Sequence, residues 1–270
     1  SNTVDIGQTV NFQTTITAQP GAQNYVLHDK MDAGLTFDGT VTVKKNGTDV
    51  DTTNYTLKKS TDSSTAITDD CTFEIAFHDT FCDGLKTGDT IVVTYSATLN
   101  ENAVIAGEGN KNTTKLTYGD SSETTSSTTT TKTFELPVLK YTMKNNTETP
   151  LAGATFTLSK KNDGTELIKL VSGENNTYRV ATTSETGTVT AVTTTASGEF
   201  TIQGLDADTY YLTETKQPDG YNKLSAPITV VIDENGNITV NGQKSSVTEV
   251  KVLNNTGTIL PTTGGNGTSL

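Results

Sequence analysis

Apolar and polar residues alternate with a period of two along almost the whole chain, and this pattern restricts the fold more than any other feature. The clearest run, residues 91–99, reads IVVTYSATL. Such alternation is typical of strands that bury one face. Threonine, roughly a fifth of all residues, favours strands and disfavours helix interiors because it is β-branched. We expect an all-β chain with helix only in short patches, around residues 84–86 or 103–107.

Asparagine–glycine pairs at the ends of alternating runs predict tight hairpins. Asn46-Gly47 follows the run TVTVKK at residues 40–45, and Asn235-Gly236 separates residues 228–232 from residues 238–240. Both central residues of a type I′ turn need positive φ, which Asn and Gly tolerate. Short strands separated by such turns predict β-sandwiches rather than a propeller or a solenoid.

A Ser/Thr-rich stretch divides the chain. Residues 120–132 read DSSETTSSTTTTK and lack apolar periodicity, which is typical of a flexible linker or of a polar edge strand. A length of 270 residues also suits about two domains. We therefore expect two immunoglobulin-like β-sandwich domains in tandem, at residues 1–130 and 131–257, followed by a Gly-rich tail at residues 258–270.

The charge and the rare residue types exclude several classes of function. A net charge of −12 argues against a nucleic-acid partner, which would need a basic footprint. No apolar run reaches about 18 residues, so no membrane-spanning helix is expected. The two histidines and two cysteines show no metal-ligand spacing, which predicts no metal and no cofactor.

Alternation places His28 on the solvent face of its strand. Cys71 and Cys82 either form one disulfide, which an extracellular compartment would permit, or remain two unpaired thiols.

Three strands of the second predicted domain carry a polar residue on their apolar face. Apolar residues at 134, 136 and 138 are followed by Lys140, those at 210 and 212 by Glu214, and those at 250 and 252 by Asn254. Each of these residues taken alone can be a strand end that has left the core. A buried charge without a partner costs several kcal/mol, however, so we expect the three side chains to meet in one core.

Such a trio predicts a chemical reaction within the chain. Burial disfavours the charged form of Lys140, and a neutral amine is a nucleophile. A buried Glu214 can stay protonated and polarise the Asn254 carboxamide. Attack by the amine would expel ammonia and leave an amide cross-link, formed once per molecule. This is not a turnover enzyme, and replacing Glu214 with Ala is expected to block the bond.

Three motifs resemble those of Gram-positive pilin subunits that are assembled by sortase. Residues 210–221, YYLTETKQPDGY, match the E-box pattern YxLxETxxPxGY, and residues 151–158, LAGATFTL, look like a strand of the Cna-B-type domain. Residues 260–264, LPTTG, are similar to the LPxTG sorting signal. The resemblance implies a Cna-type sandwich with a Lys140–Asn254 isopeptide bond assisted by Glu214. Lys144, four residues further along the same strand, is the competing lysine.

The first domain resembles the fimbrial isopeptide-forming domain of the same family. The resemblance rests on residues 5–12 (DIGQTVNF), 25–37 (YVLHDKMDAGLTF), 95–99 (YSATL) and 110–118 (NKNTTKLTY). It implies that Asp29 is the assisting carboxylate and Asn112 the acceptor. The family's lysine would lie before the opening strand, where this sequence has only residues 1–4, so the lysine partner of Asn112 stays unassigned.

The resemblance also implies partners and a location. Sortase would cleave between Thr263 and Gly264 of the signal formed by Leu260, Pro261, Thr262, Thr263 and Gly264, and would join the chain to other pilin subunits or to the cell wall. The expected function is that of a structural subunit of an extracellular, wall-anchored pilus. The alternative is a wall-anchored adhesin or ancillary pilin that binds a host surface molecule. A missing Tyr-Pro-Lys-type motif and the lack of a hydrophobic segment after the signal lead us to expect a fragment of a longer protein.

Overall fold

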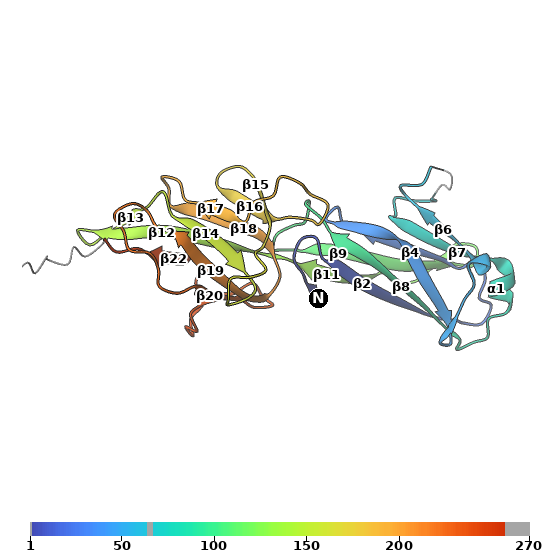
Figure 1. Ribbon diagram of the computed structural model, residues 1–270. Coiled ribbons are helices and arrows are strands. Elements are labelled where there is room, and N and C mark those ends of the chain that lie inside the picture. The colour runs from blue at the N-terminus through green and yellow to red at the C-terminus, as the bar shows by residue number, and fades with distance from the viewer. Residues whose placement is uncertain (1, 64–66, 257–270) are drawn as a thin grey trace, which may run out of the picture. The chain divides into compact units, whose positions relative to one another are not determined.

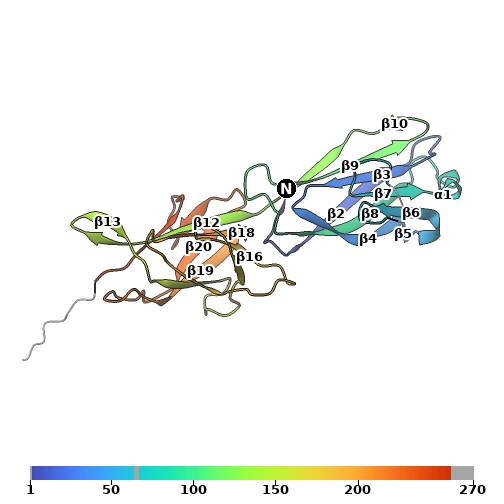
Figure 2. The ribbon, with the colours of Figure 1, turned by 90° about the horizontal axis from the view of Figure 1, so that it is seen from above.

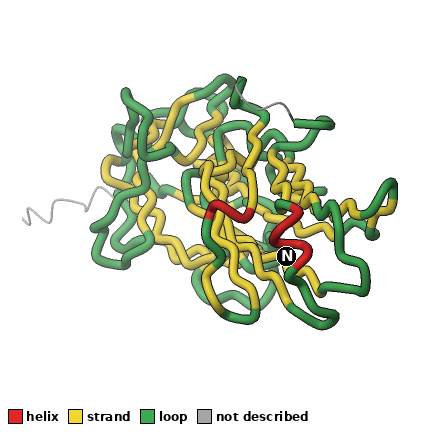
Figure 3. Tube along the Cα trace, turned by 90° about the vertical axis from the view of Figure 1, so that its right-hand side faces the viewer, coloured by secondary structure: helices red, strands yellow, loops and turns green. Residues whose placement is uncertain are grey.

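The computed structural model describes residues 2–63 and 67–256. Strands dominate this part of the chain, and Figure 3 shows little helix, in red. The described helical segments are a 3-10 turn, η1 (Thr52–Asn54), and one short helix, α1 (Asp79–Asp83). The all-β prediction is confirmed, but the predicted helical patches are wrong. Helix α1 precedes the patch at residues 84–86, because Gly84 is the residue at which it ends.

The chain divides into two compact units. The first contains Ser1–Glu135 together with Arg179–Thr186 and Gln203–Ala207, and the second contains the rest. Sheets of seven and four strands build the first unit, and sheets of six and five strands build most of the second. Figures 1 and 2 show these strands from two directions.

In the first unit, the seven-stranded sheet has the order β1-β11-β9-β3-β7-β6, with β10 paired to β9. Its strands are β1 (Asn2–Thr3), β3 (Val26–Met31), β6 (Tyr55–Lys59), β7 (Phe73–Phe77), β9 (Asn110–Tyr118), β10 (Ser122–Glu123) and β11 (Ser127–Lys132). The second sheet has the order β2-β8-β4-β5, formed by β2 (Thr9–Thr17), β4 (Leu35–Lys45), β5 (Thr48–Asp49) and β8 (Thr90–Leu99). Aromatic rings join the two sheets, since the Phe73 ring centroid lies 4.3 Å from that of Phe37 and 5.0 Å from that of Tyr95.

The Ser/Thr-rich stretch contains two strands, β10 (Ser122–Glu123) and β11 (Ser127–Lys132), joined by residues 124–126. Strand β11 pairs antiparallel with β9 over Ser127 to Thr131 and parallel with β1 at Thr131 and Lys132. Of the two alternatives left open by the sequence, the structure therefore shows the strand, and it lies inside the sheet between β1 and β9. Thr131 is buried there. Threonine suits this place because its β-branched side chain packs well on a pleated surface.

The second unit is likewise built from two sheets. The six-stranded sheet has the order β13-β12-β18-β16-β15, with β22 paired to β12, and consists of β12 (Phe134–Lys144), β13 (Thr147–Pro150), β15 (Leu170–Ser172), β16 (Thr177–Val180), β18 (Glu199–Leu205) and β22 (Val250–Leu253). The other sheet has the order β17-β14-β19-β20-β21, formed by β14 (Thr155–Ser159), β17 (Ala191–Thr193), β19 (Asp208–Lys216), β20 (Ile228–Ile232) and β21 (Ile238–Val240). The rings of Phe156 and Phe200, one from each sheet, meet at 5.6 Å between centroids.

Both predicted hairpins are present. Strands β4 and β5 pair across Asn46 and Gly47, whose φ angles are 50° and 83°. Strands β20 and β21 pair antiparallel on either side of the turn that contains Gly236. In the second hairpin, Ile228, Val230 and Ile232 of β20 and Ile238 of β21 are buried.

Across the residues that the structure describes, no helix is long and apolar enough to span a membrane.

Candidate functional site

A lysine, a glutamate and an asparagine meet inside the second unit. Lys140 lies on β12, Glu214 on β19 in the other sheet, and Asn254 directly after β22. Their relative exposures are 0%, 2% and 1%. Alternation explains the burial, because each residue continues the apolar face of its own strand.

Parallel pairing of the first and last strands of this unit brings Lys140 and Asn254 into one place. Lys140 is opposite Val252 in the β12–β22 pair. The backbone N–H of Asn254 donates to the carbonyl of Tyr141 at 3.0 Å, which continues the ladder beyond the end of β22. A pairing between residues this far apart in sequence is a property of the tertiary fold.

The Glu214 carboxylate bridges the other two side chains. Its Oε2 lies 3.3 Å from Lys140 Nζ, and its Oε1 accepts a hydrogen bond from Asn254 Nδ2 at 3.1 Å. Asn254 Nδ2 also donates to the carbonyl of Asn222 at 2.8 Å, which holds the carboxamide in one orientation. The sequence argument expected Glu214 to act on the carbonyl of Asn254, whereas the structure places it against the amide nitrogen.

The environment of Lys140 favours a neutral amine. Burial lowers the pKa of Lys140 from 10.5 to about 8, even though the nearby Glu214 acts to raise it. Its Nζ makes no hydrogen bond and lies 6.0 Å from the centroid of the Phe156 ring. Glu214 Oε2 and Asn254 Oδ1 are also buried without a hydrogen-bond partner. The competing lysine, Lys144, is exposed at the end of β12 and lies outside this cluster.

A related cluster lies in the first unit. Asp29 on β3 and Asn112 on β9 are buried, and both contact the hydroxyl of Tyr95 on β8. The hydroxyl donates to Asp29 Oδ2 at 2.5 Å, and Asn112 Nδ2 donates to the hydroxyl oxygen at 3.0 Å. Tyr95 is not among the residues predicted from the sequence. Its place at a core position of the run 91–99 could have identified it, because the hydroxyl of a buried tyrosine needs a hydrogen-bond partner.

Burial controls the electrostatics of this second cluster. It raises the pKa of Asp29 from 3.8 to about 6, against the lowering effect of the hydrogen bonds with Tyr95 and Asn112. Asp29 Oδ1 and Asn112 Oδ1 have no hydrogen-bond partner among the described residues. A cavity of about 220 Å³ adjoins Tyr95 and Asn112. The structure thus brings Asp29 and Asn112 together without a lysine bound to these atoms.

Both cysteines are buried free thiols, so the disulfide alternative does not hold. Cys71 precedes β7 and Cys82 follows it on α1, so a whole extended strand separates the two sulfur atoms. A disulfide needs α-carbons within about 7 Å. Burial raises the pKa of Cys71, which keeps this thiol protonated.

The prediction that His28 faces solvent is wrong. Its exposure is 7%, because the segment before β7 covers the outer face of β3. Alternation assigns a side chain to a face of its strand but does not reveal what covers that face. The predicted sorting signal, residues 260–264, lies outside the described residues.

Two sheets packed face to face in each unit define an all-β protein of immunoglobulin-like sandwiches. Residues 139–246 match the family model described as the SpaA prealbumin-like fold domain. No curated protein sequence matches the chain.

Solved pilin structures share this fold over nearly the whole chain. One is the pilus 2b backbone protein of group B streptococcus, with 23% identity, a TM-score of 0.66 and coverage of 97% of this chain and 98% of that chain. Another is the 35 kDa C-terminal fragment of the major pilin GBS80 of Streptococcus agalactiae, with 19% identity, a TM-score of 0.68 and coverage of 94% and 95%. The pilus backbone protein RrgB of Streptococcus pneumoniae matches at 17% identity and a TM-score of 0.64, with 94% of each chain covered. At these identities the likeness establishes the fold.

Proposed function

We propose that this chain is a structural subunit of an extracellular pilus and that its second unit cross-links itself through Lys140 and Asn254. The observation that carries the proposal is the fully buried contact of Lys140, Glu214 and Asn254. The likeness to solved pilus backbone proteins supports the same function. A buried amine and a buried carboxyl group beside an unpaired carboxamide oxygen cost stability in a purely structural core, so a chemical role explains why they are there.

The reaction is an amide exchange that one carboxyl group can assist at both ends. Lys140 Nζ attacks the side-chain carbonyl carbon of Asn254, and the bond from that carbon to Nδ2 breaks. Glu214 Oε2, 3.3 Å from the amine, takes a proton from it, and Oε1, 3.1 Å from Nδ2, supplies the proton with which ammonia leaves. Holding the groups in contact replaces an encounter between free molecules, which can supply about 7–11 kcal/mol of the barrier.

The position of the bond fits a subunit that carries load. Lys140 is on the first strand of the second unit, and Asn254 directly follows the last. A tension applied to the two ends of the unit would otherwise shear the β12–β22 hydrogen bonds, since these strands are parallel. A covalent bond between Lys140 and Asn254 would transmit the tension directly, so that residues 141–253 are not stretched.

Assembly of the pilus requires a second reaction, at residues that lie outside the described part of the chain. In the proposed function, sortase joins the chain to other subunits or to the cell wall through the sequence LPTTG at residues 260–264. The single-turnover cross-link needs no cofactor, and no turnover activity is proposed for the chain.

Intact-protein mass spectrometry tests the cross-link. Formation of one amide expels one ammonia and lowers the mass by about 17 Da. We expect one such loss in the wild type, because among the described residues Asp29 Oδ1 and Asn112 Oδ1 have no hydrogen-bond partner, lysine included. Peptide mapping should place the bond between Lys140 and Asn254.

Matched variants separate the chemistry from folding. Lys140→Arg and Glu214→Gln should have the full mass, whereas Lys144→Arg on the same strand should keep the loss. Glu214→Gln preserves size and can still accept a hydrogen bond, but its amide cannot transfer protons. A wild type of full mass, or a Glu214→Gln variant that still loses ammonia at the wild-type rate, contradicts the mechanism.

A further inference from the structure

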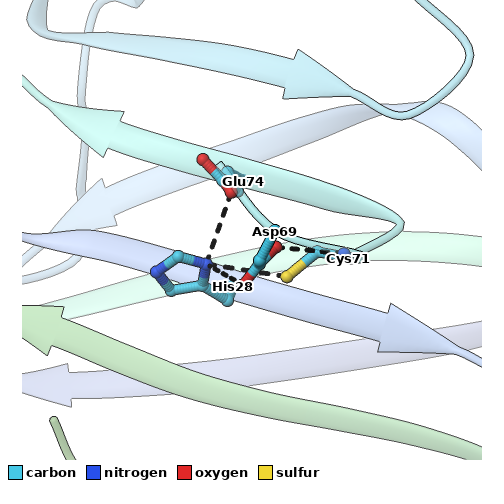
Figure 4. Close-up of side chains that lie close together, drawn as sticks. All are labelled: His28, Asp69, Cys71 and Glu74. Carbon is cyan, nitrogen blue, oxygen red and sulfur yellow. Dashed lines mark hydrogen bonds and ion pairs between the residues drawn. The ribbon is translucent and has the colours of Figure 1, made fainter. Parts of the chain in front are cut away.

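Four potential metal ligands converge on the outer face of the first unit. Figure 4 shows His28 of β3, Glu74 of β7, and Asp69 and Cys71 of the segment before β7 pointing toward one another. From His28 Nδ1 the distances are 3.1 Å to Asp69 Oδ2, 3.5 Å to Glu74 Oε1 and 3.6 Å to Cys71 Sγ. One ligand atom from each of the four residues lies within 4.8 Å of all the others.

Hydrogen bonds from outside the group orient its members. His28 Nε2 lies 2.9 Å from Thr117 Oγ1, which leaves Nδ1 directed into the cluster. Glu74 Oε1 accepts hydrogen bonds from the backbone N–H and the hydroxyl of Thr68, at 2.8 Å and 2.6 Å. Asp69 Oδ1 accepts the backbone N–H of Cys71 at 3.0 Å. Outer contacts of this kind are what fix the ligands of protein metal sites.

A network of hydrogen bonds alone does not account for this arrangement. Two carboxylates and a sulfur surround a single imidazole nitrogen, and one N–H can serve only one of them well. Glu74 is 1% exposed, so its charge is removed from water. A bound cation would balance the carboxylates of Asp69 and of the buried Glu74, and burial of a carboxylate favours such a partner.

A catalytic cysteine does not account for it either. In a Cys-His-Asp relay the sulfur and the carboxylate contact different ring nitrogens. Here Cys71 and Asp69 both approach Nδ1, while Nε2 faces Thr117.

We propose that His28, Asp69, Cys71 and Glu74 bind one Zn²⁺ ion, at a structural site separate from the proposed cross-link. Zinc accepts nitrogen, sulfur and carboxylate oxygen together, and its tetrahedral ligands at 2.0–2.3 Å lie about 3.3–3.8 Å apart. The three distances from Nδ1, 3.1 Å, 3.5 Å and 3.6 Å, are close to this spacing, and all four ligand atoms lie within 4.8 Å of one another. Four protein ligands complete the shell, which is typical of a structural zinc site.

Binding balances as a proton exchange. Zn²⁺ replaces the proton of the Cys71 thiol, which goes to solvent, and takes the lone pair of Nδ1 from a ring protonated at Nε2. The Nε2–H then donates to Thr117 Oγ1. No electron is transferred, because zinc has no redox chemistry under these conditions.

The surroundings allow a cation to enter. A cavity of about 250 Å³ is lined by His28, Asp69 and Cys71, and the Asp69 side chain is 32% exposed. Lys30 and Lys115 also line it, but they are ion-paired with Asp70 and Glu123. The site joins strand β3 to the segment before β7, so bound zinc should stabilise the first unit.

Titration of the untagged 270-residue chain tests the proposal with Zn²⁺ itself and with Co²⁺ as a spectroscopic probe. We expect one equivalent of Zn²⁺ to bind, with a rise in the melting temperature that a chelator reverses. Co²⁺ should give a thiolate-to-metal absorption band in the near ultraviolet. The band should be lost in Cys71→Ser and retained in Cys82→Ser, which changes the other buried thiol.

A milder variant covers the case in which Cys71→Ser does not fold. Thr117→Val leaves all four ligands in place and removes the hydroxyl that contacts Nε2 and, at 3.5 Å, the carbonyl of Val26, so the affinity for Zn²⁺ should fall about 10–100-fold. Absence of binding by the wild type, or of the cobalt–thiolate band in both the wild type and Cys82→Ser, overturns the proposal. Equal affinities for the wild type and a folded Cys71→Ser variant do so as well.

Discussion

Burial moves the pKa of Lys140 and that of Asp29 in opposite directions, and both shifts favour the uncharged form. The amine falls to about 8 and the carboxyl rises to about 6, with desolvation the largest cause in each case. In the proposed chemistry Lys140 attacks as a neutral amine, so the exclusion of water from its core favours the reaction.

The raised pKa of Asp29 predicts how the stability of the first unit depends on pH. The folded unit holds the Asp29 proton up to about pH 6, whereas the unfolded chain releases it near 3.8. Stability is therefore fully present below pH 3.8 and declines as the pH rises, until both states are ionised above about 6. A shift of this size corresponds to about 3 kcal/mol. Calorimetry of the full chain between pH 4 and 8 measures it.

Asp29→Asn provides the control for this prediction. Asparagine keeps the shape and still accepts the Tyr95 hydrogen bond, but it does not ionise. The variant should lose this part of the pH dependence and exceed the stability of the wild type at pH 8. An unchanged pH profile would show that Asp29 is charged or solvated in the folded unit.

At the scale of elements, strand β12 depends on the turn before β18. Gly198 has a φ of 68°, and its carbonyl accepts the backbone N–H of Lys140 at 2.7 Å. A Cβ at Gly198 would lie 2.3 Å from the carbonyl oxygen of Lys140. Glycine is required here both by the backbone angle and by the close approach of the neighbouring strand.

Gly198→Ala should therefore displace β12 at Lys140, and Gly164→Ala is its matched control. Gly164 has a φ of 75° but open space around its Cβ position. Alanine at a positive φ costs about 1–2 kcal/mol at either site. Gly198→Ala should cost more, with the excess due to the clash, and should slow the proposed cross-link.

Chemical denaturation in a Glu214→Gln background measures the two costs without the covalent bond. Mass spectrometry of Gly198→Ala and Gly164→Ala in the native background measures the rate of bond formation. Equal destabilisation by both alanines would mean that the Lys140 carbonyl does not constrain the turn.

At the scale of the whole molecule, the proposed bond gives the two units different mechanical properties. The proposed Lys140–Asn254 bond would join the first and last strands of the second unit, whereas in the described part of the first unit Asp29 Oδ1 and Asn112 Oδ1 have no hydrogen-bond partner. Under tension only hydrogen bonds and packing would hold the first unit. The second would extend no further than its covalent bond permits.

Single-molecule stretching of the full chain tests this difference. A second unit without the bond should release residues 141–253 and lengthen by about 380 Å. We expect this step in Glu214→Gln and not in the wild type, while the first unit extends in both and serves as the internal control. A wild-type second unit that extends fully would contradict the proposed force path.

Local pattern was sufficient to predict which side chains face a core. Lys140, Glu214 and Asn254 were singled out because they continue apolar faces, and all three are buried. Asp29 and Asn112, which the family resemblance implies, are also buried. The period of two is set by the backbone of each strand, so it can be read without knowledge of the neighbours.

Two features depend on the tertiary structure: which segments cover each face of a strand, and which distant strands pair. Parity places His28 on the outer face of β3, but the segment carrying Asp69 and Cys71 folds over it. The hydroxyl of Tyr95 joins Asp29 to Asn112 from a strand of the other sheet. Thus the sequence by itself determined the all-β class, the hairpins and the faces, because alternation and turn chemistry are local. The clusters, the free thiols and the place of β11 depend on contacts between residues far apart in the chain, which no local pattern records.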